Sequence, residues 1–422
     1  MNVDSICAEL REGASLLSLC TSRQKNHALE CVRDSLLSDK ETILEANSVD
    51  VKLSRDRGIS ESLIERLALD EKKFDSILQS IDVIIGQTDP IGEELSGWKT
   101  PDGLLIRQVR VPLGIVAIIY ESRPNVTVDA FALAYKSGNS ILLRGSSSAL
   151  NSNQALVASI KKGLKKAGQD GVQDTIYLCP STDHSDVTDI LNAAGKIDVV
   201  LPRGSARLIN TVVQNARIPV IQTGAGVCHL YVDDSADIDK AVNIAFNAKT
   251  QRPGACNAIE TILVNTKVLK TFLPALASAF NGKVELRADS ECYQILKDVM
   301  KDSIDKLKPA CEEDFGFEFL DYIAAIKAVD SVEEAIDFIN THNTKHSEAI
   351  ITSSIQSARL FQSRVDASCV YVNASTRFTD GGEFGFGAEL GISTQKLHAR
   401  GPMGIKALTT TKYLIDGDGQ VR

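Results

Sequence analysis

The sequence predicts an α/β protein whose strands lie parallel in open sheets. Short apolar runs bounded by glycine or proline recur in the first half of the chain, at 115–119, 141–143, 175–178, 199–201 and 220–221. Stretches with helical periodicity, such as 153–166 and 206–214, lie between these runs. Because each gap has room for a helix, we expect right-handed strand–helix–strand crossovers, which make neighbouring strands parallel.

The first 97 residues predict helices alone. Their apolar side chains recur at helical spacing with charged residues between them, so each helix has one face to bury; examples are Ile6, Leu10, Ala14 and Leu17, and then Phe74, Ile77, Leu78 and Ile81. The turn-rich segment 97–103 follows. Alternating residues then run to Val111, and this pattern predicts a β-hairpin.

A second α/β region is predicted from about residue 229 to 370. Helical periodicity recurs at 238–249 and 332–340, and apolar strand-like runs occur at 259–264, 322–326 and 349–351. The segment 381–404 is dense in glycine, and residues 408–414 predict a terminal strand.

Composition and charge disfavour several classes of protein. The chain has 46 Lys and Arg against 55 Asp and Glu, a formal net charge of −9, and its lysine-rich segment 161–166 fits the solvated face of a helix. We therefore expect no nucleic-acid partner. No apolar run reaches about 18 residues, and residues 1–5 lack a basic or apolar stretch, so neither a membrane span nor a signal peptide is expected.

The nine cysteines predict neither a disulfide framework nor a metal site. They are odd in number, scattered, and without a Cys-x-x-Cys pair. Such cysteines are typical of a reducing compartment, so we expect a cytoplasmic protein without a bound metal.

Cys256 is the candidate nucleophile. It lies in the segment 251–258 between a predicted helix and a predicted strand, and Gly254, Ala255 and Ala258 leave little bulk around its sulfur. A substrate could therefore reach the thiol. The alternative is that Cys256 is an inert, packed side chain, which is the commoner role of a single cysteine.

Three loops that favour anions follow strands of the first predicted sheet. They are 120–125, which contains Arg123 and Asn125, then 144–148, with Arg144 and three serines, and 202–206, which opens a helix. In a parallel sheet ligands bind beyond the carboxyl ends of the strands, where these loops lie. For the first loop, a helix cap with a surface ion pair is an equal alternative. The dinucleotide fingerprint Gly-x-Gly-x-x-Gly is absent, since His229 and Leu390 stand where a third glycine would be.

Distinctive stretches extend over nearly the whole chain, at 111–139, 141–146, 201–205, 226–233, 254–261, 373–378, 391–394 and 398–402. These stretches resemble the γ-glutamyl phosphate reductase family of the aldehyde dehydrogenase superfamily. The resemblance implies an aldehyde dehydrogenase-like α/β fold with a parallel-sheet cofactor domain, an α/β catalytic domain and a β-flap for oligomerisation.

The resemblance also implies how the chain is divided. The NADP-binding domain would take residues 1–97 and 112–228, and the catalytic domain with the nucleophilic cysteine would take 229–370. The oligomerisation flap would combine 98–111 with 402–422, and 371–401 would return the chain to the cofactor domain.

Site residues follow from the same resemblance. It makes Cys256 the nucleophile that forms a thioester, and Asn125 an amide donor to the oxyanion. It assigns NADPH to Arg144, Gly145, Ser146, Gly204, Ser205, Glu313 and Phe315. For the amino-acid end of the substrate we name Ser122, Arg123 and Arg377, and each arginine could instead be a structural ion pair.

The implied reaction is the NADPH-dependent reduction of L-glutamate 5-phosphate to the 5-semialdehyde with release of phosphate, the second step of proline biosynthesis. The implied partners are this substrate, a functional association with glutamate 5-kinase, and further copies of the chain. Two alternatives stay open: an oxidative NAD-dependent semialdehyde dehydrogenase, and a non-catalytic scaffold of the same fold. Gln222 disfavours oxidation, because oxidising relatives place a glutamate base there.

Overall fold

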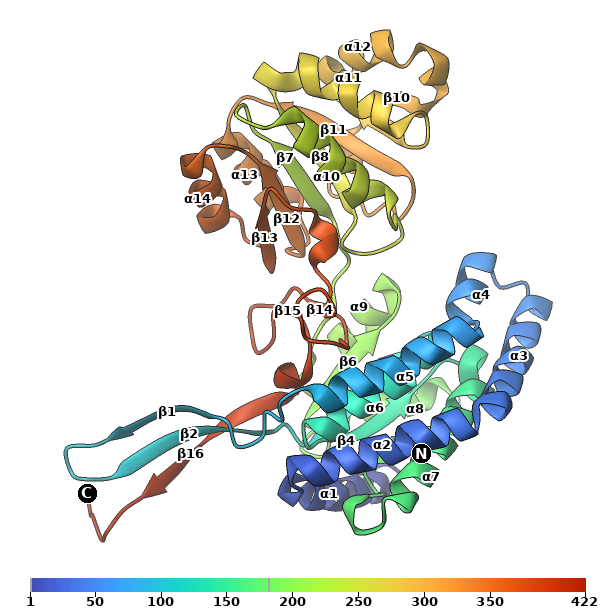
Figure 1. Cartoon of the computed structure of the whole chain (residues 1–422), viewed down its shortest axis with the longest axis vertical. Helices are drawn as coiled ribbons and strands as arrows, with labels where there is room; N and C mark the ends of the chain where they lie inside the picture. Colours follow the sequence, from blue (N-terminus) through green and yellow to red (C-terminus); the bar gives the residue numbers. More distant parts are fainter. Residues whose placement is uncertain (1, 181–182) are drawn as a thin grey trace. The chain divides into compact units, whose positions relative to one another are not determined.

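The computed structural model describes residues 2–180 and 183–422, which form two compact units (Figure 1). Unit 1 comprises Met1–Thr223, Gly385–Gly391 and Pro402–Arg422. Unit 2 comprises Gly224–Phe384 and Ile392–Gly401. Each unit has its own parallel sheet and its own core, so we describe each by itself.

Unit 1 begins with five helices. They are α1 (Val3–Leu19), α2 (Ser22–Ser38), α3 (Lys40–Asp56), α4 (Glu61–Leu67) and α5 (Glu71–Gly86). Local capping explains several of the starts: the side chains of Asn2 and Asp70 accept from backbone N–H groups, and Thr21 forms a reciprocal capping box with Gln24. These helices confirm the helical prediction for this part of the chain.

The sheet of unit 1 has four parallel strands in the order β5-β4-β3-β6. Its elements alternate along the chain: β3 (Ile115–Tyr120), α6 (Pro124–Lys136), β4 (Ser140–Arg144), α7 (Leu150–Lys166), β5 (Ile176–Leu178), α8 (His184–Leu191), β6 (Val199–Arg203) and α9 (Ala206–Asn215). The run at 220–221 forms only an isolated bridge from Val220 to Val200. The register pairs Ile119 with Arg144 and Tyr120 with Arg203, so β3, β4 and β6 end at one edge.

Close packing of helices completes this unit. Helix α2 contacts α7 where an added Cβ on Gly163 would overlap the backbone of Val32, so only glycine allows this approach. The side chains of α1 and α8 pack on one face of the sheet, over Ile115, Ala117 and Ile119. The lysines of segment 161–166 are exposed, which confirms the prediction of a solvated helix face.

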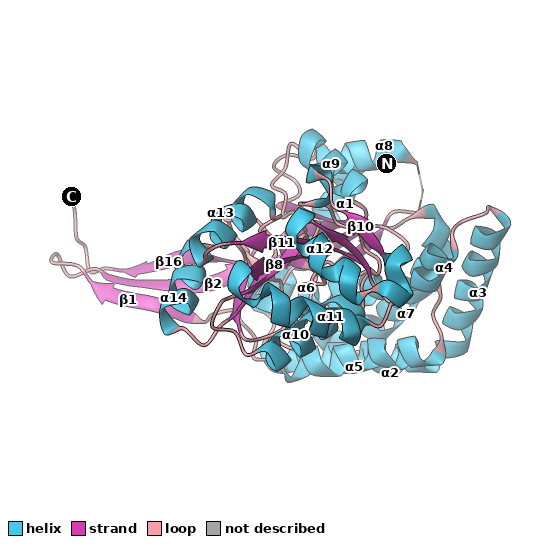
Figure 2. Cartoon of the chain, turned by 90° about the horizontal axis from the view of Figure 1, so that it is seen from above, coloured by secondary structure: helices cyan, strands magenta, loops and turns pink. Residues whose placement is uncertain are grey.

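An antiparallel sheet of three strands joins distant parts of unit 1, in the order β1-β2-β16 (Figures 1 and 2). The strands are β1 (Glu94–Lys99), β2 (Leu105–Pro112) and β16 (Thr409–Asp416). Strand β1 therefore begins within the segment expected to be helical. The turn is confined to residues 100–104, because Gly97 and Trp98 pair with β2. Trp98 and Tyr413 are exposed and make an edge-to-face contact with ring centroids 6.1 Å apart.

Unit 2 has a parallel sheet of seven strands in the order β10-β9-β11-β8-β7-β12-β13. The strands are β7 (Cys228–Val232), β8 (Ile259–Asn265), β9 (Glu285–Ala288), β10 (Leu307–Pro309), β11 (Ile323–Val329), β12 (Ser347–Ile351) and β13 (Cys369–Val372). The helices are α10 (Ile238–Thr250), α11 (Leu269–Phe280), α12 (Ser290–Val299), α13 (Val332–His342) and α14 (Ile355–Arg364).

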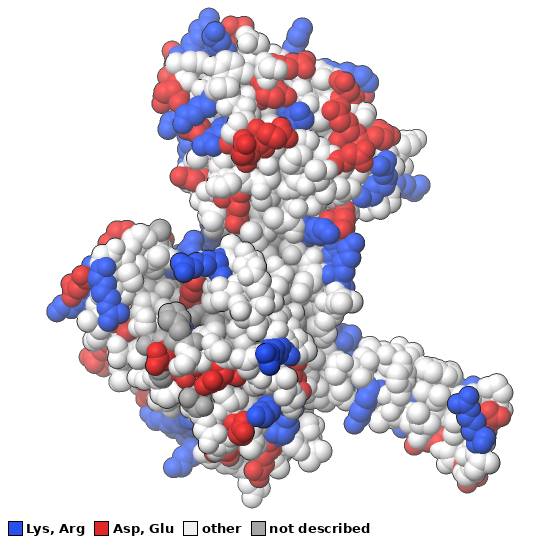
Figure 3. All heavy atoms as spheres, turned by 180° about the vertical axis from the view of Figure 1, so that it is seen from behind, with Lys and Arg blue, Asp and Glu red and all other residues white. Residues whose placement is uncertain are grey.

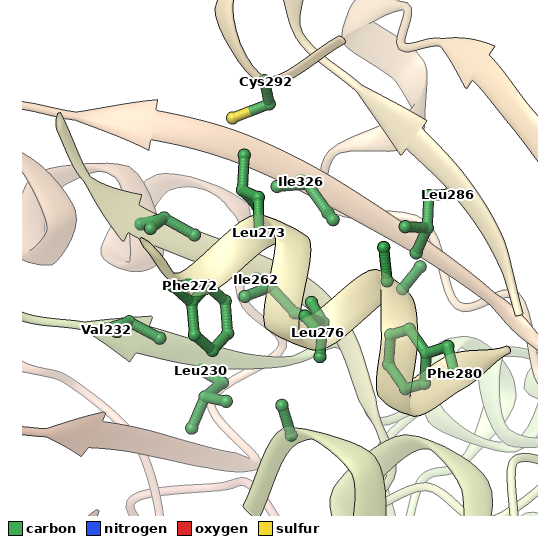
Figure 4. Packing of buried hydrophobic residues seen from close by; sticks show 14 of the residues in the cluster. Leu230, Val232, Ile262, Phe272, Leu273, Leu276, Phe280, Leu286, Cys292 and Ile326 are labelled. Carbon is green, nitrogen blue, oxygen red and sulfur yellow. The ribbon is translucent and has the colours of Figure 1, made fainter. Parts of the chain in front are cut away.

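Strands β7, β8 and β12 of unit 2 are buried on both faces. Leu230, Ile262 and Ile326 pack against α10, α11 and α12, as Figure 4 shows for α11. Tyr231 and Leu263, the neighbours in sequence of Leu230 and Ile262, pack on the other face with α13 and α14. Two-sided burial explains why the sequence shows continuous apolar runs here instead of alternation.

The predicted α/β class with parallel sheets is confirmed in both units. The short elements that remain are the strands β14 (Ile392–Ser393) and β15 (Gly401–Pro402), and 3-10 turns η1 (Ser147–Ala149), η2 (Gly168–Asp170), η3 (Thr266–Val268), η4 (Lys301–Lys306), η5 (Glu312–Asp314), η6 (Thr376–Phe378) and η7 (Ile405–Leu408). Among the described residues no helix is both long and apolar enough to cross a membrane.

On the face drawn in Figure 3, acidic and basic side chains are interspersed.

Candidate active site

Cys256 lies in a tight loop, residues 251–258, between helix α10 and strand β8 of unit 2. The loop is turned by backbone hydrogen bonds from Ala255 N to Arg252 O, 3.1 Å, and from Ala258 N to Ala255 O, 2.9 Å. Cys256 is partly exposed, whereas the next two residues are buried. Cys256 therefore lies on the accessible side of the loop, together with the exposed residues Gln251, Arg252 and Gly254.

A buried ion pair closes the base of this loop. The Lys249 Nζ lies 2.6 Å from Glu260 Oε2, and both side chains are fully buried. Lys249 is the last residue but one of helix α10, and Glu260 is the second residue of strand β8. Burial raises the pKa of Glu260 and lowers the pKa of Lys249, while each partner opposes the shift of the other. Removing one partner alone would leave an uncompensated buried charge, so the pair holds the two ends of the loop together.

The backbone of Cys256 is supported from below by the segment that leads into β7. Gly226 lies so close that an added Cβ would overlap the Cys256 carbonyl oxygen. The same oxygen accepts a hydrogen bond from Cys228 Sγ at 3.2 Å. Because burial raises the pKa of the Cys228 thiol well above its usual value, that thiol keeps its proton and remains a donor.

Further buried polar groups continue from Cys228. Its sulfur lies 3.7 Å from His346 Nδ1, which lies 2.8 Å from Ser347 Oγ. That hydroxyl is 2.7 Å from Thr379 Oγ1, which is also 2.7 Å from the Tyr371 hydroxyl. The loop that carries Cys256 is thus held by a continuous polar network within the core.

Segment 375–380 lies along the side of the loop. Asn257 Nδ2 donates to Thr379 O at 2.9 Å, and Thr376 Oγ1 donates to Asn257 O at 2.6 Å. Arg377 Nε donates to Gln251 Oε1 at 2.9 Å. Although Arg377 is far from Cys256 in sequence, the fold places the guanidinium beside the loop.

The anion-favouring loops of unit 1 meet at one edge of its sheet. Ser122 Oγ and Ser146 Oγ both lie next to Ser148 Oγ, at 2.7 and 2.8 Å, which forms a cluster of three hydroxyls. Arg144, at the end of β4, donates to the carbonyls of Gly145 and Asp183.

The start of helix α9 already binds a carboxylate. Glu121 accepts from Ser205 N and Ser205 Oγ, each at 2.8 Å, and Gly204 leaves the space that the Glu121 carboxyl occupies. A helix N-terminus favours negative charge because its first N–H groups have no partner in the helix. This helix start, where Gly204 and Ser205 are predicted to bind NADPH, is therefore suited to an oxyanion. A phosphate of the cofactor would have to displace the Glu121 carboxylate there.

The remaining predicted residues are divided between the units. In unit 1, Arg123 is the N-cap of α6, and Asn125 Nδ2 donates to Asp129 Oδ2 at 3.1 Å. In unit 2, Glu313 is exposed in η5, and Phe315 is buried edge-to-face against Phe338 with ring centroids 5.4 Å apart.

Within unit 2, the structure brings Arg377 to the Cys256 loop, and within unit 1 it joins Ser122 to Ser146. The roles of Cys228, Gly226 and Glu121 were not predicted. A buried cysteine and a glycine before a strand look like ordinary packing in the sequence. In the loop 120–125 the sequence predicted roles for Arg123 and Asn125. In the structure Glu121 of the same loop is the residue that contacts Ser205.

Replacing Cys228 tests the support beneath the loop. In Cys228→Ala the buried Cys256 carbonyl loses its thiol donor, so we expect a loss of about 1 kcal/mol in the free energy of unfolding. We also expect several-fold faster alkylation of Cys256 by iodoacetamide, followed by peptide mass spectrometry. Cys228→Ser keeps a donor and should restore the slow alkylation. Cys292→Ala, at another fully buried cysteine in α12, is the control for lost volume. Equal alkylation of Cys256 in all four proteins would contradict this role.

Comparison with known proteins identifies the family of the chain. The model of the aldehyde dehydrogenase family matches residues 65–293 and 293–413. The chain is 50% identical over 413 residues to the gamma-glutamyl phosphate reductase of Dictyoglomus thermophilum, covering 98% of this chain and 97% of that protein. It is 50% identical over 422 residues to the enzyme of that name from Clostridium acetobutylicum, covering 100% and 98%. The crystal structure of gamma-glutamyl phosphate reductase from Thermotoga maritima is 46% identical, with a TM-score of 0.94 and full coverage of both chains. The chain thus belongs to the aldehyde dehydrogenase family and, within it, to the gamma-glutamyl phosphate reductases.

Proposed function

We propose that the protein reduces L-glutamate 5-phosphate to L-glutamate 5-semialdehyde with NADPH and releases phosphate, the second step of proline biosynthesis. The observation that carries the proposal is the supported, partly exposed Cys256 in a chain about 50% identical over its whole length to gamma-glutamyl phosphate reductases. As a member of that family the chain is an oxidoreductase that acts on an acyl phosphate.

Cys256 begins the proposed reaction. Its thiolate attacks the acyl carbon, a sulfur–carbon bond forms, and the carbon–oxygen bond to phosphate breaks, which leaves a thioester on the enzyme. Sulfur suits this role because a thiolate is a strong nucleophile and a fair leaving group. Bound NADPH would supply the hydride. The thiohemiacetal on Cys256 then collapses to the aldehyde and regenerates the thiolate. The family match supports the oxyanion role predicted for Asn125.

The residues of unit 1 fit a nicotinamide dinucleotide, whose use follows from membership in the aldehyde dehydrogenase family. Ser205 already holds an oxyanion, the Glu121 carboxylate, so it and Gly204 fit the pyrophosphate. The hydroxyl cluster at Ser146 and the charged Arg144, beside Gly145, fit a ribose with a 2′-phosphate. Of the predicted residues in unit 2, exposed Glu313 would hold the nicotinamide ribose, and Phe315 would line that side.

Two other functions are less well supported. Oxidation of an aldehyde to an acid needs a base to activate water on the thioester, and Gln222 has no carboxylate. A non-catalytic scaffold would not need a buried network that holds the loop around a partly exposed thiol. We therefore favour the reductase.

The proposed partners follow from the same assignment. Association with glutamate 5-kinase would deliver the acyl phosphate, and co-purification of the two proteins tests it. None of the nine cysteines forms a disulfide within the described part of the chain, which fits a cytoplasmic location, to be checked by cell fractionation.

Cys256→Ala tests the covalent mechanism. We expect loss of reduction with NADPH binding retained, because neither water nor alanine replaces the thiolate. Cys256→Ser should keep little activity, since a serine hydroxyl is scarcely ionised near neutral pH. Steady-state assays and a fluorescence titration with NADPH measure the two properties. Reduction at the wild-type rate by Cys256→Ala would disprove the thioester.

Arg144→Ala tests the cofactor assignment. Losing a charge-assisted contact to the 2′-phosphate costs about 1.5–3 kcal/mol, so KM for NADPH should rise roughly 10- to 150-fold while KM for NADH changes little. Lys161→Ala, which removes an exposed charge from α7, is the matched control. Equal losses with both cofactors would assign Arg144 to packing or to the shared ribose.

We further propose that the sheet β1-β2-β16 pairs with another copy of the chain. Strand β1 is exposed along its whole length, and Trp98, Tyr413 and Ile415 are exposed apolar side chains. Removing residues 409–422 should lower the mass in light scattering towards that of one chain. An unchanged mass would contradict this assignment.

A further inference from the structure

A pocket of about 210 Å³ lies beside the Cys256 loop within unit 2. One wall is the last turn of α10, with Asn247 and Gln251, and the other is segment 377–383, with Arg377, Phe378, Asp380 and Glu383. The pocket thus combines one cation, two carboxylates, two amides and one aromatic ring. Cys256 does not line this pocket, so the pocket takes no part in the steps proposed for the thiol.

Arg377 is held in place without a counter-ion. Its Nε donates to Gln251 Oε1, and among the described residues no carboxylate forms an ion pair with its guanidinium. Burial, and then the nearby Arg252, lower the pKa of Arg377, yet a guanidinium remains charged in proteins. A half-buried cation with a fixed orientation and free terminal N–H groups is suited to bind an anion from outside the chain.

The two carboxylates are similarly uncompensated. Asp380 Oδ1 accepts from Gly382 N at 2.9 Å, and Glu383 has neither a hydrogen bond nor an ion pair among the residues described here. Neither carboxylate pairs with Arg377, although all three side chains line the same pocket. The C-terminal end of α10 adds partial negative charge at the opposite wall. The pocket therefore holds opposite charges that make no direct ion pair among the described residues, although the charge of Asp380 is near enough to oppose the lowering of the Arg377 pKa.

We propose that this pocket binds the zwitterionic α-amino-acid end of the substrate, with Arg377 on the α-carboxylate and Asp380 and Glu383 on the α-ammonium group. This inference rests on the proposed function and names the groups that determine its specificity. A zwitterion satisfies both charge types at once, whereas a simple anion or cation satisfies only one. Phe378, which is 49% exposed, provides an apolar surface for the two methylene groups that precede the acyl carbon.

The pocket is tied to the nucleophile by hydrogen bonds. Asn257, the residue after Cys256, donates to the carbonyls of Arg377 and Thr379 and accepts from Thr376 Oγ1. Gln251, which orients Arg377, belongs to the same loop as Cys256. A substrate anchored at its amino-acid end would consequently be positioned relative to the thiol, so both KM and kcat should respond to the anchor.

Aldehyde specificity in the reverse reaction tests the proposal. Phosphate-dependent NADP⁺ reduction is measured with three aldehydes: L-glutamate 5-semialdehyde, 5-oxopentanoate, which lacks the ammonium group, and 4-aminobutanal, which lacks the carboxylate. The double variant Asp380→Asn, Glu383→Gln should lower kcat/KM for the semialdehyde by roughly 10- to 100-fold and leave 5-oxopentanoate nearly unchanged. Arg377→Met should lower kcat/KM for both carboxylated aldehydes and spare 4-aminobutanal.

The ratio of the kcat/KM values for two aldehydes, measured on one preparation, does not depend on the fraction of folded protein. Asp298→Asn, which neutralises an exposed carboxylate on α12, is the control and should keep all three rates. Equal losses on all three aldehydes in the pocket variants would overturn the proposal, because the pocket would then be only structural. A wild-type enzyme that oxidises none of the aldehydes with phosphate would overturn the proposed function and this inference with it.

Discussion

The backbone of Cys256 is the fixed point on which the candidate site of unit 2 depends. Its carbonyl oxygen is so close to Gly226 that no side chain fits between them, and it accepts a hydrogen bond from the Cys228 thiol. Below, the ion pair of Lys249 and Glu260 joins the two ends of the loop. A nucleophile must be held within a fraction of an ångström of its productive position, and these contacts supply that rigidity from the core.

Rigidity at the loop also explains how distant parts of unit 2 become one site. Asn257 is held on both sides by segment 376–379, so the loop and the segment that carries Arg377 are fixed to each other. The charged groups of the neighbouring pocket can therefore be left uncompensated. In a flexible segment Arg377 and Asp380 would reach each other and neutralise, since long side chains readily form such surface pairs. The segment that carries these charges is held here by hydrogen bonds from the side chains of Asn257 and Thr376 to backbone carbonyls.

Unit 1 uses a different constraint, the common edge at which parallel strands end. The register of β3 with β4 and β6 brings the hydroxyls of Ser122 and Ser146 close to Ser148, and Glu121 close to Ser205. Glu121 shows that the start of α9 attracts an oxyanion. It also means that any phosphate bound there competes with a carboxylate of the chain itself. If the proposed dinucleotide binds at this helix start, its affinity depends on the free energy of displacing Glu121 from Ser205.

The sequence determined the α/β class, the helical start and the position of Cys256 between a helix and a strand, because periodicity and turn residues are local properties. It also determined that Arg144, Ser146 and Ser205 follow strands, and a parallel sheet brings such ends together whatever the details of packing. Family motifs added the proposed reaction.

Only the tertiary structure decided which side chains meet. The beginning of β1 at Glu94 depends on pairing with β2, which the local sequence does not encode. The role of Cys228 depends on a carbonyl 28 residues away in sequence, and that of Arg377 on Gln251, 126 residues away. In the sequence, Asp380 and Glu383 are ordinary surface acids. They acquire the proposed function because the fold places them in one pocket with a guanidinium to which they form no ion pair among the described residues, and such long-range placement is set by packing rather than by local pattern.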